Sequence, residues 1–145
     1  MQVFGEEGKR RVEKHHKQRE GKGFITLERP ASLEDIPERC AKGVVLLECL
    51  SNRLANAMFS QKLYDAKEEI LKEIREISKV ADLIIVTNEV FSDDIYYDKE
   101  TMSYIEKLGS LNCEIVNMSD FAVESVYGLL NVLKGENYAN CLEWV

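Results

Sequence analysis

The sequence lacks several features that mark large classes of protein. None of its apolar runs approaches the roughly 20 residues that cross a bilayer. Its first 20 residues contain no apolar core of a secretion signal. The four cysteines form no C-x-x-C pair, which argues against a zinc site and predicts reduced, mostly buried thiols. We therefore expect a cytoplasmic protein that makes no contact with a membrane.

Positive charge is scarce and is concentrated near the start of the chain. Nineteen lysines and arginines stand against 26 acidic residues, which gives a net charge of -7. So acidic a chain lacks the basic surface that displaces counterions from nucleic acid, and no nucleic-acid partner is expected. Residues 9–22 nevertheless hold a run of basic side chains and both histidines. This segment indicates either a focused site for an anion such as phosphate or a solvated helix face.

A phosphate-binding loop is also missing, because the pattern G-x-x-x-x-G-K-[ST] occurs nowhere in the 145 residues. What is present is ordinary for a globular protein, with 45% hydrophobic and 31% charged residues. The length suits one domain, residues 1–145, although the tail 136–145 has no clear assignment.

The apolar pattern predicts an α/β fold, in which strands alternate with helices. Two nearly continuous apolar runs, 44–50 and 83–87, are typical of strands buried on both faces of a parallel sheet. Apolar residues three and four apart predict an amphipathic helix over 63–81. The remaining expected elements are helices over 1–20, 32–41, 52–60 and 99–117 and strands over 24–28 and 123–127.

Polar side chains lie at the ends of both apolar strands. Glu48 is near the end of the first strand, and Asn88 and Glu89 follow the second. The carboxyl ends of parallel strands share one edge of the sheet, where α/β proteins bind ligands. Carboxylates there suit Mg²⁺, so a phosphate or nucleotide site is one hypothesis. Alternatively, Glu48 pairs with a nearby cation, and the other two residues end a strand and cap a turn.

Five motifs in order, spread over about residues 6–135, carry a resemblance to a known family. The patterns are R-[IV]-x-x-H-x-x-x-R, T-x-E-x-P, LL[DE]C[LI]T followed by Asn, VTNEVG, and G-x-x-N followed by Asp and Gly. They match RVEKHHKQR at 11–19, TLERP at 26–30, LLECLS at 46–51 with Asn56, VTNEV at 86–90, and Gly109 to Asn112 with Asp120 and Gly128. The sequence resembles the bifunctional adenosylcobinamide kinase / adenosylcobinamide-phosphate guanylyltransferases of cobalamin biosynthesis.

The resemblance implies a three-layer, mostly parallel sheet of the P-loop NTPase type, a corrinoid substrate, and Mg²⁺ with GTP or ATP as cofactors. It implies that His15 attacks the α-phosphorus of GTP and becomes guanylylated. Six further residues are candidates for binding the phosphates or the nucleotide: Arg11, Lys14, Arg19, Glu48, Asn88 and Glu89. Of these, Glu48 is also a candidate for assisting Mg²⁺. The alternative is that His15 and His16 are two surface histidines on a basic helix.

The sequence also departs from the family pattern. The family begins with a loop of the form GG-x-x-SGKS, and this chain begins after it. The family's glycine after VTNEV is Phe91, its glycine-isoleucine-valine-proline stretch is DIYY at 94–97, and an expected basic residue is Met102. We therefore expect a chain truncated at its N-terminus that is inactive or incomplete as a nucleotide enzyme, or that works with a separate P-loop-bearing chain.

Other functions stay open beside this one. The main alternative is a non-catalytic relative that keeps the fold as a corrinoid- or protein-binding module. A weaker one is a histidine phosphocarrier that uses His15. The two apolar strands also bear on assembly, because neither suits an edge exposed to water. Either they pair directly or another chain supplies a strand between them, and we expect a homo-oligomer with strand 44–50 paired on both sides.

Overall fold

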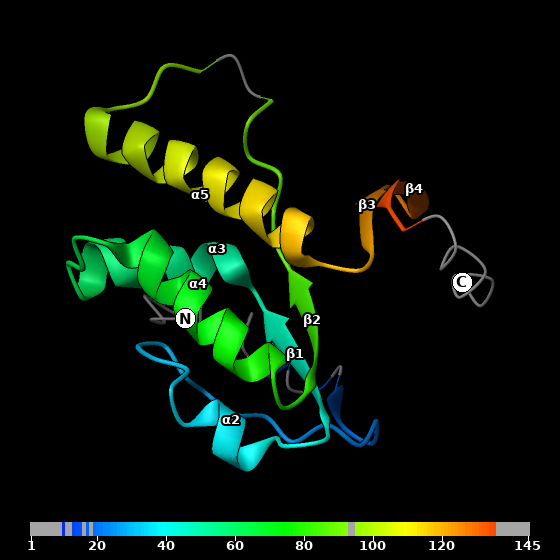
Figure 1. Ribbon diagram of the computed structural model, residues 1–145. Coiled ribbons are helices and arrows are strands. Elements are labelled where there is room, and N and C mark those ends of the chain that lie inside the picture. The colour runs from blue at the N-terminus through cyan, green and yellow to red at the C-terminus, as the bar shows by residue number, and fades with distance from the viewer. Residues whose placement is uncertain (1–9, 11–12, 16, 18, 93–94, 136–145) are drawn as a thin grey trace. The chain divides into compact units, whose positions relative to one another are not determined.

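The computed structural model describes residues 10, 13–15, 17, 19–92 and 95–135 (Figure 1). The chain divides into two compact units, with the boundary between Asn88 and Glu89. In the described part of the chain no helix is long and apolar enough to span a bilayer. Strands and helices are both present, so the expected α/β class is confirmed at that level.

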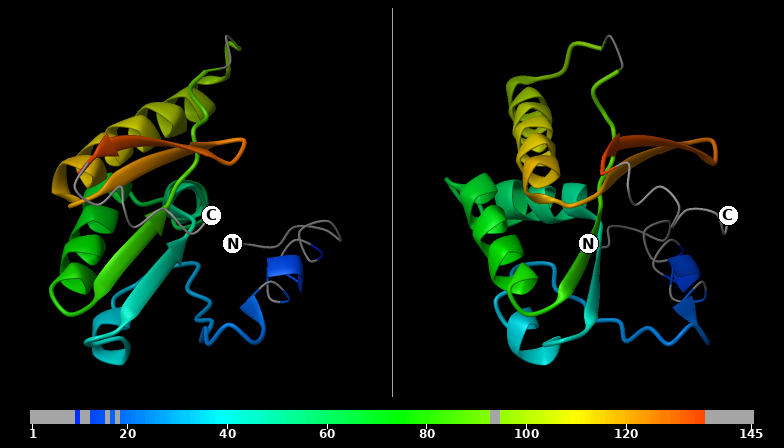
Figure 2. Two further views of the ribbon diagram at one scale, coloured as in Figure 1. Left: turned by 90° about the vertical axis from the view of Figure 1, so that its right-hand side faces the viewer. Right: turned by 45° about the vertical axis from the view of Figure 1, so that its right-hand side comes forward.

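The first unit is built on a two-stranded parallel sheet. Strand β1 (Val44–Glu48) pairs in parallel with its neighbour β2 (Asp82–Val86) (Figure 2). The register sets Val44 opposite Asp82 and Glu48 opposite Val86. The two apolar strands thus pair directly with one another. The short helix α2 (Ile36–Arg39) precedes β1. The connection from β1 to β2 contains α3 (Leu50–Ala55), its π-helical continuation η1 (Asn56–Ser60), and α4 (Ala66–Ser78).

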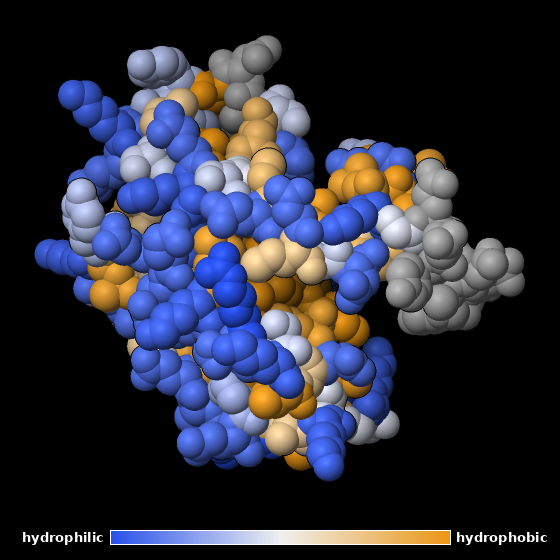
Figure 3. All heavy atoms as spheres, in the orientation of Figure 1, coloured by the Kyte–Doolittle hydropathy of each residue, from blue (hydrophilic) through white to orange (hydrophobic). Residues whose placement is uncertain are grey.

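Helix α4 has the two faces that its sequence predicts. Its apolar side chains three and four residues apart are buried, whereas Lys72, Arg75 and Glu76 are exposed. Polar side chains accordingly cover the surface over α4 in Figure 3. The buried apolar side chains are Ala66, Ile70, Leu71, Ile74 and Ile77. The predicted amphipathic helix is confirmed, within bounds three residues shorter at each end.

The β1–β2 sheet is buried on one face only. Its inner face places Val45, Leu47 and Leu83 against a cluster of Leu33, Ile36 and Ile77. On the other face Val44 is 66% exposed and Ile84 is 54% exposed. The expectation of strands buried on both faces was therefore wrong. Side chains alternate between the faces of a strand. One face packs against the hydrophobic cluster, and the apolar side chains of the other face stay more than a third exposed.

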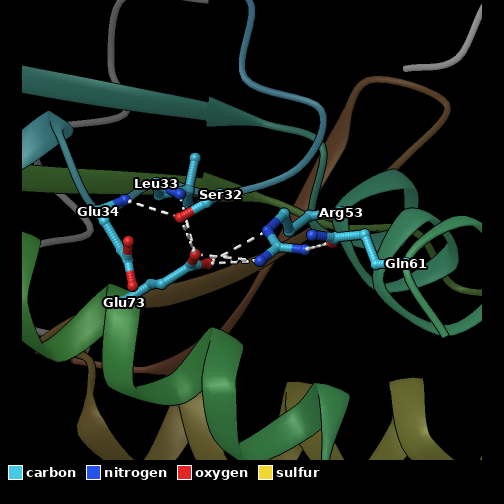
Figure 4. A network of polar contacts seen from close by, with 6 residues as sticks. All are labelled: Ser32, Leu33, Glu34, Arg53, Gln61 and Glu73. Carbon is cyan, nitrogen blue, oxygen red and sulfur yellow. Dashed lines mark hydrogen bonds and ion pairs between the residues drawn. The ribbon is translucent and has the colours of Figure 1, made fainter. Parts of the chain in front are cut away.

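A buried ion pair links the helices of the first unit (Figure 4). The guanidinium of Arg53 donates to both oxygens of Glu73, from Nε at 3.1 Å and from Nη2 at 3.0 Å. Both side chains are only 3% exposed. The Glu73 carboxylate also accepts from the Leu33 amide at 2.9 Å and the Ser32 hydroxyl at 3.1 Å. These partners offset the cost of burying two charges and attach the segment before α2 to α4.

The second unit consists of helix α5 (Lys99–Met118) and a hairpin of β3 (Ala122–Val126) and β4 (Leu129–Lys134). Asp98 caps α5 by accepting from the amides of Glu100 and Thr101. Tyr127 and Gly128 form the two-residue turn of the hairpin, both with positive φ. Lys134 donates to the carbonyls of Val116 and Asn117, which lie in the last turn of α5. The hairpin is thereby attached to the C-terminal end of this helix.

Several expected elements differ from those observed. Residues 24–28 form no strand, because no neighbouring strand pairs with them among the described residues. The helix expected over 32–41 shrinks to α2, and the Ser32 hydroxyl instead accepts from the amide of Glu34. Strand β4 was not expected, whereas α5 and β3 lie within one residue of their predicted bounds. The free cysteines Cys40, Cys49 and Cys113 are partly or fully exposed, so the expected burial of the thiols was wrong for these three.

Candidate functional site

His15 and Arg19 approach the carboxylate at the end of β1. The described residues between 10 and 19 are helical, so these two side chains, four residues apart, lie on one helix face. Nδ1 of His15 lies 3.2 Å from Oε1 of Glu48. Nη2 of Arg19 lies 2.9 Å from Oε2 of the same carboxylate. Each oxygen of Glu48 thus faces one side-chain nitrogen.

The strand explains why a carboxylate stands at this point. Glu48 is the last residue of β1, and its side chain follows Val44 and Leu46 on the outer face of the sheet. The side chains of Glu48 and Arg19 are 31% and 26% exposed, and that of His15 is 48% exposed. The group is ordered by its own contacts and still open to a ligand. The contact with Arg19 is the pairing with a nearby cation that the sequence left open for Glu48.

Thr26 adds a third segment to this group. Nη1 of Arg19 donates to the Thr26 hydroxyl at 3.5 Å, while Nη2 holds Glu48. The segments 11–19, 26–30 and 46–51, recognised separately in the sequence, therefore converge in space. We define His15, Arg19, Thr26 and Glu48 as the histidine–carboxylate site.

A second polar group joins the first turn of α3 to the end of β2. The Ser51 hydroxyl donates to Oδ1 of Asn88 at 3.2 Å and lies 3.1 Å from the thiol of Cys49. The side-chain amide of Asn52 donates from Nδ2 to the same sulfur at 3.0 Å. The carboxyl ends of the two strands are thus tied together by side chains. Asn88 was among the predicted site residues, and its observed contact is with the protein's own α3.

Lys14 lies apart from the histidine–carboxylate site. Neighbouring residues on a helix point about 100° apart, so Lys14 is turned away from His15. It lines a hollow with Arg10, Glu13 and Lys17, and Lys17 forms an ion pair with Glu13 at 3.2 Å. The basic helix therefore presents two different stripes of charge. Arg11, which was predicted to bind phosphate, and His16 lie outside the described residues.

Glu89, the last predicted site residue, belongs to the second unit. Its Oε1 accepts from the Phe91 amide at 2.7 Å and from the Ser92 hydroxyl at 3.0 Å. It also lines a hollow together with Val90, Ser92, Tyr97, Thr101, Tyr104 and Ile105. The turn-capping role that the sequence left open is what these contacts show.

The described residues contain no group of three or more His, Cys, Asp or Glu side chains arranged to hold a metal ion. Both oxygens of Glu48, the predicted Mg²⁺ ligand, are already in contact with His15 and Arg19. As it lies, the Glu48 carboxylate fits a role toward these two nitrogens better than it fits direct coordination of a metal.

Comparison with known proteins agrees with the motifs that converge here. A family model described as cobinamide kinase / cobinamide phosphate guanyltransferase matches residues 1–133. The chain belongs to this family. A search among curated proteins finds no match. The family confirms the resemblance seen in the sequence and assigns the chain to cobalamin biosynthesis as a cobinamide kinase/guanyltransferase-like protein.

Within this family member, sequence reasoning found His15, Arg19 and Glu48 but did not select Thr26 or the contacts of Ser51. A signal for Thr26 was present, since it begins the TLERP motif. Thr26 and Glu48 are far apart in the sequence, so no sequence pattern predicted that they belong to one site. Only the fold, which brings residue 26 back to the end of β1, places it beside Arg19.

Proposed function

We propose that this chain carries the guanylyl-accepting part of the family's active site, with His15 as the catalytic nucleophile. In the first step a ring nitrogen of His15 attacks the α-phosphorus of GTP. The nitrogen–phosphorus bond forms as the bond to pyrophosphate breaks. In the second step a phosphate oxygen of cobinamide phosphate attacks the same phosphorus, and the bond to His15 breaks. The observation that carries this proposal is the His15 ring held, half exposed, at the carboxyl end of β1.

The surrounding charges support this role. The helix that bears His15 also bears Arg10, Lys14 and Lys17, which give a positive potential along its other stripe. We assign triphosphate binding to Lys14 together with Arg11, and contact with Glu48 to Arg19. Mg²⁺ would enter with the nucleotide, held mainly by its phosphate oxygens, as this ion usually is. Asn88 is proposed to border the nucleotide at the end of β2, and Glu89 is proposed as a nucleotide-binding residue of the second unit.

The proposal includes a dependence on a phosphate-binding loop, since the G-x-x-x-x-G-K-[ST] pattern does not occur in these 145 residues. Without its amides and lysine, phosphoryl transfer loses most of its charge stabilisation. We therefore propose negligible kinase activity for this chain alone and GTP binding weaker than about millimolar. Saturating ligand at 100 times its Kd would raise stability by about 2.7 kcal/mol. A clear rise in Tm at micromolar GTP would contradict this part of the proposal.

The decisive experiment tests covalent labelling. The chain is incubated with Mg²⁺ and GTP labelled at the α-phosphorus, alone and with a P-loop-bearing chain of the same family. We expect an acid-labile, nitrogen-linked label that His15→Ala removes and His16→Ala retains. Label that persists in His15→Ala would refute the role of His15. No label under either condition would favour the second candidate function.

The second candidate is a non-catalytic relative that binds a corrinoid or a protein. One observation favours it. Phe91 stands where the family has a glycine, and its ring lies at 3.4 Å from the position that a Cβ on Gly109 would occupy. The loop before α5 thus packs an aromatic side chain against this helix at Gly109. This function would be supported if adenosylcobinamide binds, as measured by changes in the corrinoid spectrum, while His15 is not labelled. The three-layer sheet, a cytoplasmic location and assembly into a homo-oligomer are proposed with either function.

A further inference from the structure

We propose that Glu48 is a positioning residue that determines which nitrogen of His15 reacts, an inference that rests on the guanylyl transfer proposed above. The contact itself supplies the first step. Nδ1 of His15 lies 3.2 Å from Oε1 of Glu48, and an ionised carboxylate can only accept hydrogen bonds, so we assign the ring proton to the nitrogen that faces it, Nδ1. A neutral imidazole carries one ring proton. Nε2 therefore holds the lone pair, and Nε2 is the nucleophile.

The second step is that Glu48 is itself held in place. Its backbone ends β1 and stands opposite Val86 in the parallel ladder. Its second oxygen, Oε2, accepts from Arg19 at 2.9 Å, and Arg19 also donates to Thr26. Rotation of the carboxylate would break one of these contacts. The direction from which Glu48 meets the imidazole is thus set by the sheet and by Arg19.

The third step concerns the reaction. When Nε2 forms its bond to phosphorus and pyrophosphate departs, the imidazole ring gains positive charge while its proton stays on Nδ1. A carboxylate at Nδ1 stabilises that charge, as an aspartate does for the histidine of a serine-protease triad. The contact to Glu48 therefore becomes stronger as the adduct forms. This is the contribution that accelerates a reaction, since it is greater in the transition state than before it.

Another explanation is that Glu48 merely attaches the basic helix to β1. The two explanations differ in what they predict for the histidine ring. An anchoring carboxylate needs only a positive neighbour, which Arg19 supplies, and sets no preference between the two tautomers of His15. A positioning carboxylate fixes the tautomer with its proton on Nδ1.

The test is nitrogen-15 NMR of the full chain labelled on histidine. The sequence has two histidines, so His16→Gln leaves His15 as the sole source of signal. At about pH 8.5, above the ordinary titration of histidine, we expect the proton on Nδ1 and an unprotonated Nε2. Glu48→Ala, introduced into the His16→Gln protein, should move the ring proton of His15 toward Nε2. Glu48→Gln has one oxygen, which Arg19 must take because it can only donate, so the amide nitrogen faces Nδ1 and this variant too should move the proton toward Nε2. Glu13→Ala, which removes a neighbouring carboxylate paired with Lys17, is the matched control and should change nothing.

A protonated Nε2 in the His16→Gln protein would overturn the proposal. This result needs no variant of Glu48, so the test holds even if those variants fail to fold. A tautomer unchanged by Glu48→Ala in a folded protein would overturn it as well. The adduct gives an independent readout. Phosphorus–nitrogen coupling should place the guanylyl group on Nε2, and Glu48→Ala should slow labelling roughly 10- to 100-fold. Label on Nδ1 would refute the positioning role but leave the proposed function standing. The expected tautomer without any label would refute the function alone.

Discussion

At the scale of single residues, the buried pair of Arg53 and Glu73 is the polar contact that matters most for stability. Both side chains are 3% exposed, and the carboxylate also serves Ser32 and Leu33. Removing one member leaves the other charge buried and unpaired, which costs about 3–5 kcal/mol. We expect Arg53→Met to lower the free energy of unfolding by that amount, measured by urea denaturation.

The matched control is Lys79→Met, which removes an exposed ion pair. Lys79 and Glu76 are 2.6 Å apart with side chains 63% and 52% exposed. Exposed pairs contribute about 0–1 kcal/mol, so this variant should behave nearly like the parent. Equal losses in the two variants would show that the Arg53–Glu73 pair is not buried in solution.

A second prediction at this scale concerns Asp35 and low pH. Hydrogen bonds from the Arg29 side chain lower the pKa of Asp35 from 3.8 to about 2, and Nε of Arg29 lies 2.9 Å from its Oδ1. Because the folded-state pKa is lower than the unfolded one, the unfolded chain takes up the proton first as pH falls. The stabilising effect is therefore complete above about pH 5 and is lost as pH falls from about 4 to 2.

Arg29→Gln tests this prediction. Its urea midpoint should lie below that of the parent at pH 6, and the two midpoints should converge between pH 4 and pH 2. Arg39→Gln is the control, because Arg39 contacts the same carboxylate only at 3.5 Å. It should keep most of the pH dependence. A difference between Arg29→Gln and the parent that stays constant down to pH 2 would contradict the assignment.

At the scale of elements, the start of α5 depends on one side chain. Asp98 accepts from the amides of Glu100 and Thr101 and from the Thr101 hydroxyl, and the Thr101 amide is the main cause of its lowered pKa. Asp98→Ala leaves these amide groups without their partner. We expect Tm to fall by roughly 2–4 °C. Amide exchange should quicken at residues 99–101 and not at the far end of α5, and Asp98→Asn should restore most of the loss.

The elements also show what the sequence could and could not predict. Helices α4 and α5 were predictable, because one has regular apolar spacing and the other a capping aspartate. The faces of β1 were not. VVLL is apolar at every position, so the pattern contains no information about which side chains point away from the core. Strand β4, and with it the β3–β4 hairpin, was not predicted. One reason is that Tyr127 in the turn has a positive φ, which residues other than glycine seldom adopt and which the sequence therefore does not indicate.

The same limit applies to the candidate site. Glu48 stood out as a carboxylate inside an apolar run, and His15 and Arg19 stood out by their motif. Their contact depends on a segment that returns to β1 from about 30 residues away, which no local pattern encodes. Sequence reasoning therefore named these members of the site but could not specify which oxygen of Glu48 meets which nitrogen.

At the scale of the whole molecule, the outer face of the β1–β2 sheet bears on assembly. Its apolar side chains are all more than a third exposed, and among the described residues β1 pairs only with β2. They are Val44 at 66%, Leu46 at 37%, Ile84 at 54% and Val86 at 42%. A strand with a free edge and an apolar face is a template for pairing with a further chain.

We expect a homo-oligomer, at least a dimer, in which β1 gains a second strand neighbour from a partner chain and the apolar face is covered. Ile84→Lys places a charge on that face, where the native side chain is half exposed, so the monomer should still fold while association weakens. Tyr64→Lys makes a similar change at a residue that is 91% exposed and lies outside the sheet, and should leave the assembly unchanged. Light scattering at micromolar concentration measures both. A stable monomer for the parent chain would refute the expectation, because the edge of β1 would then be satisfied by water rather than by another copy.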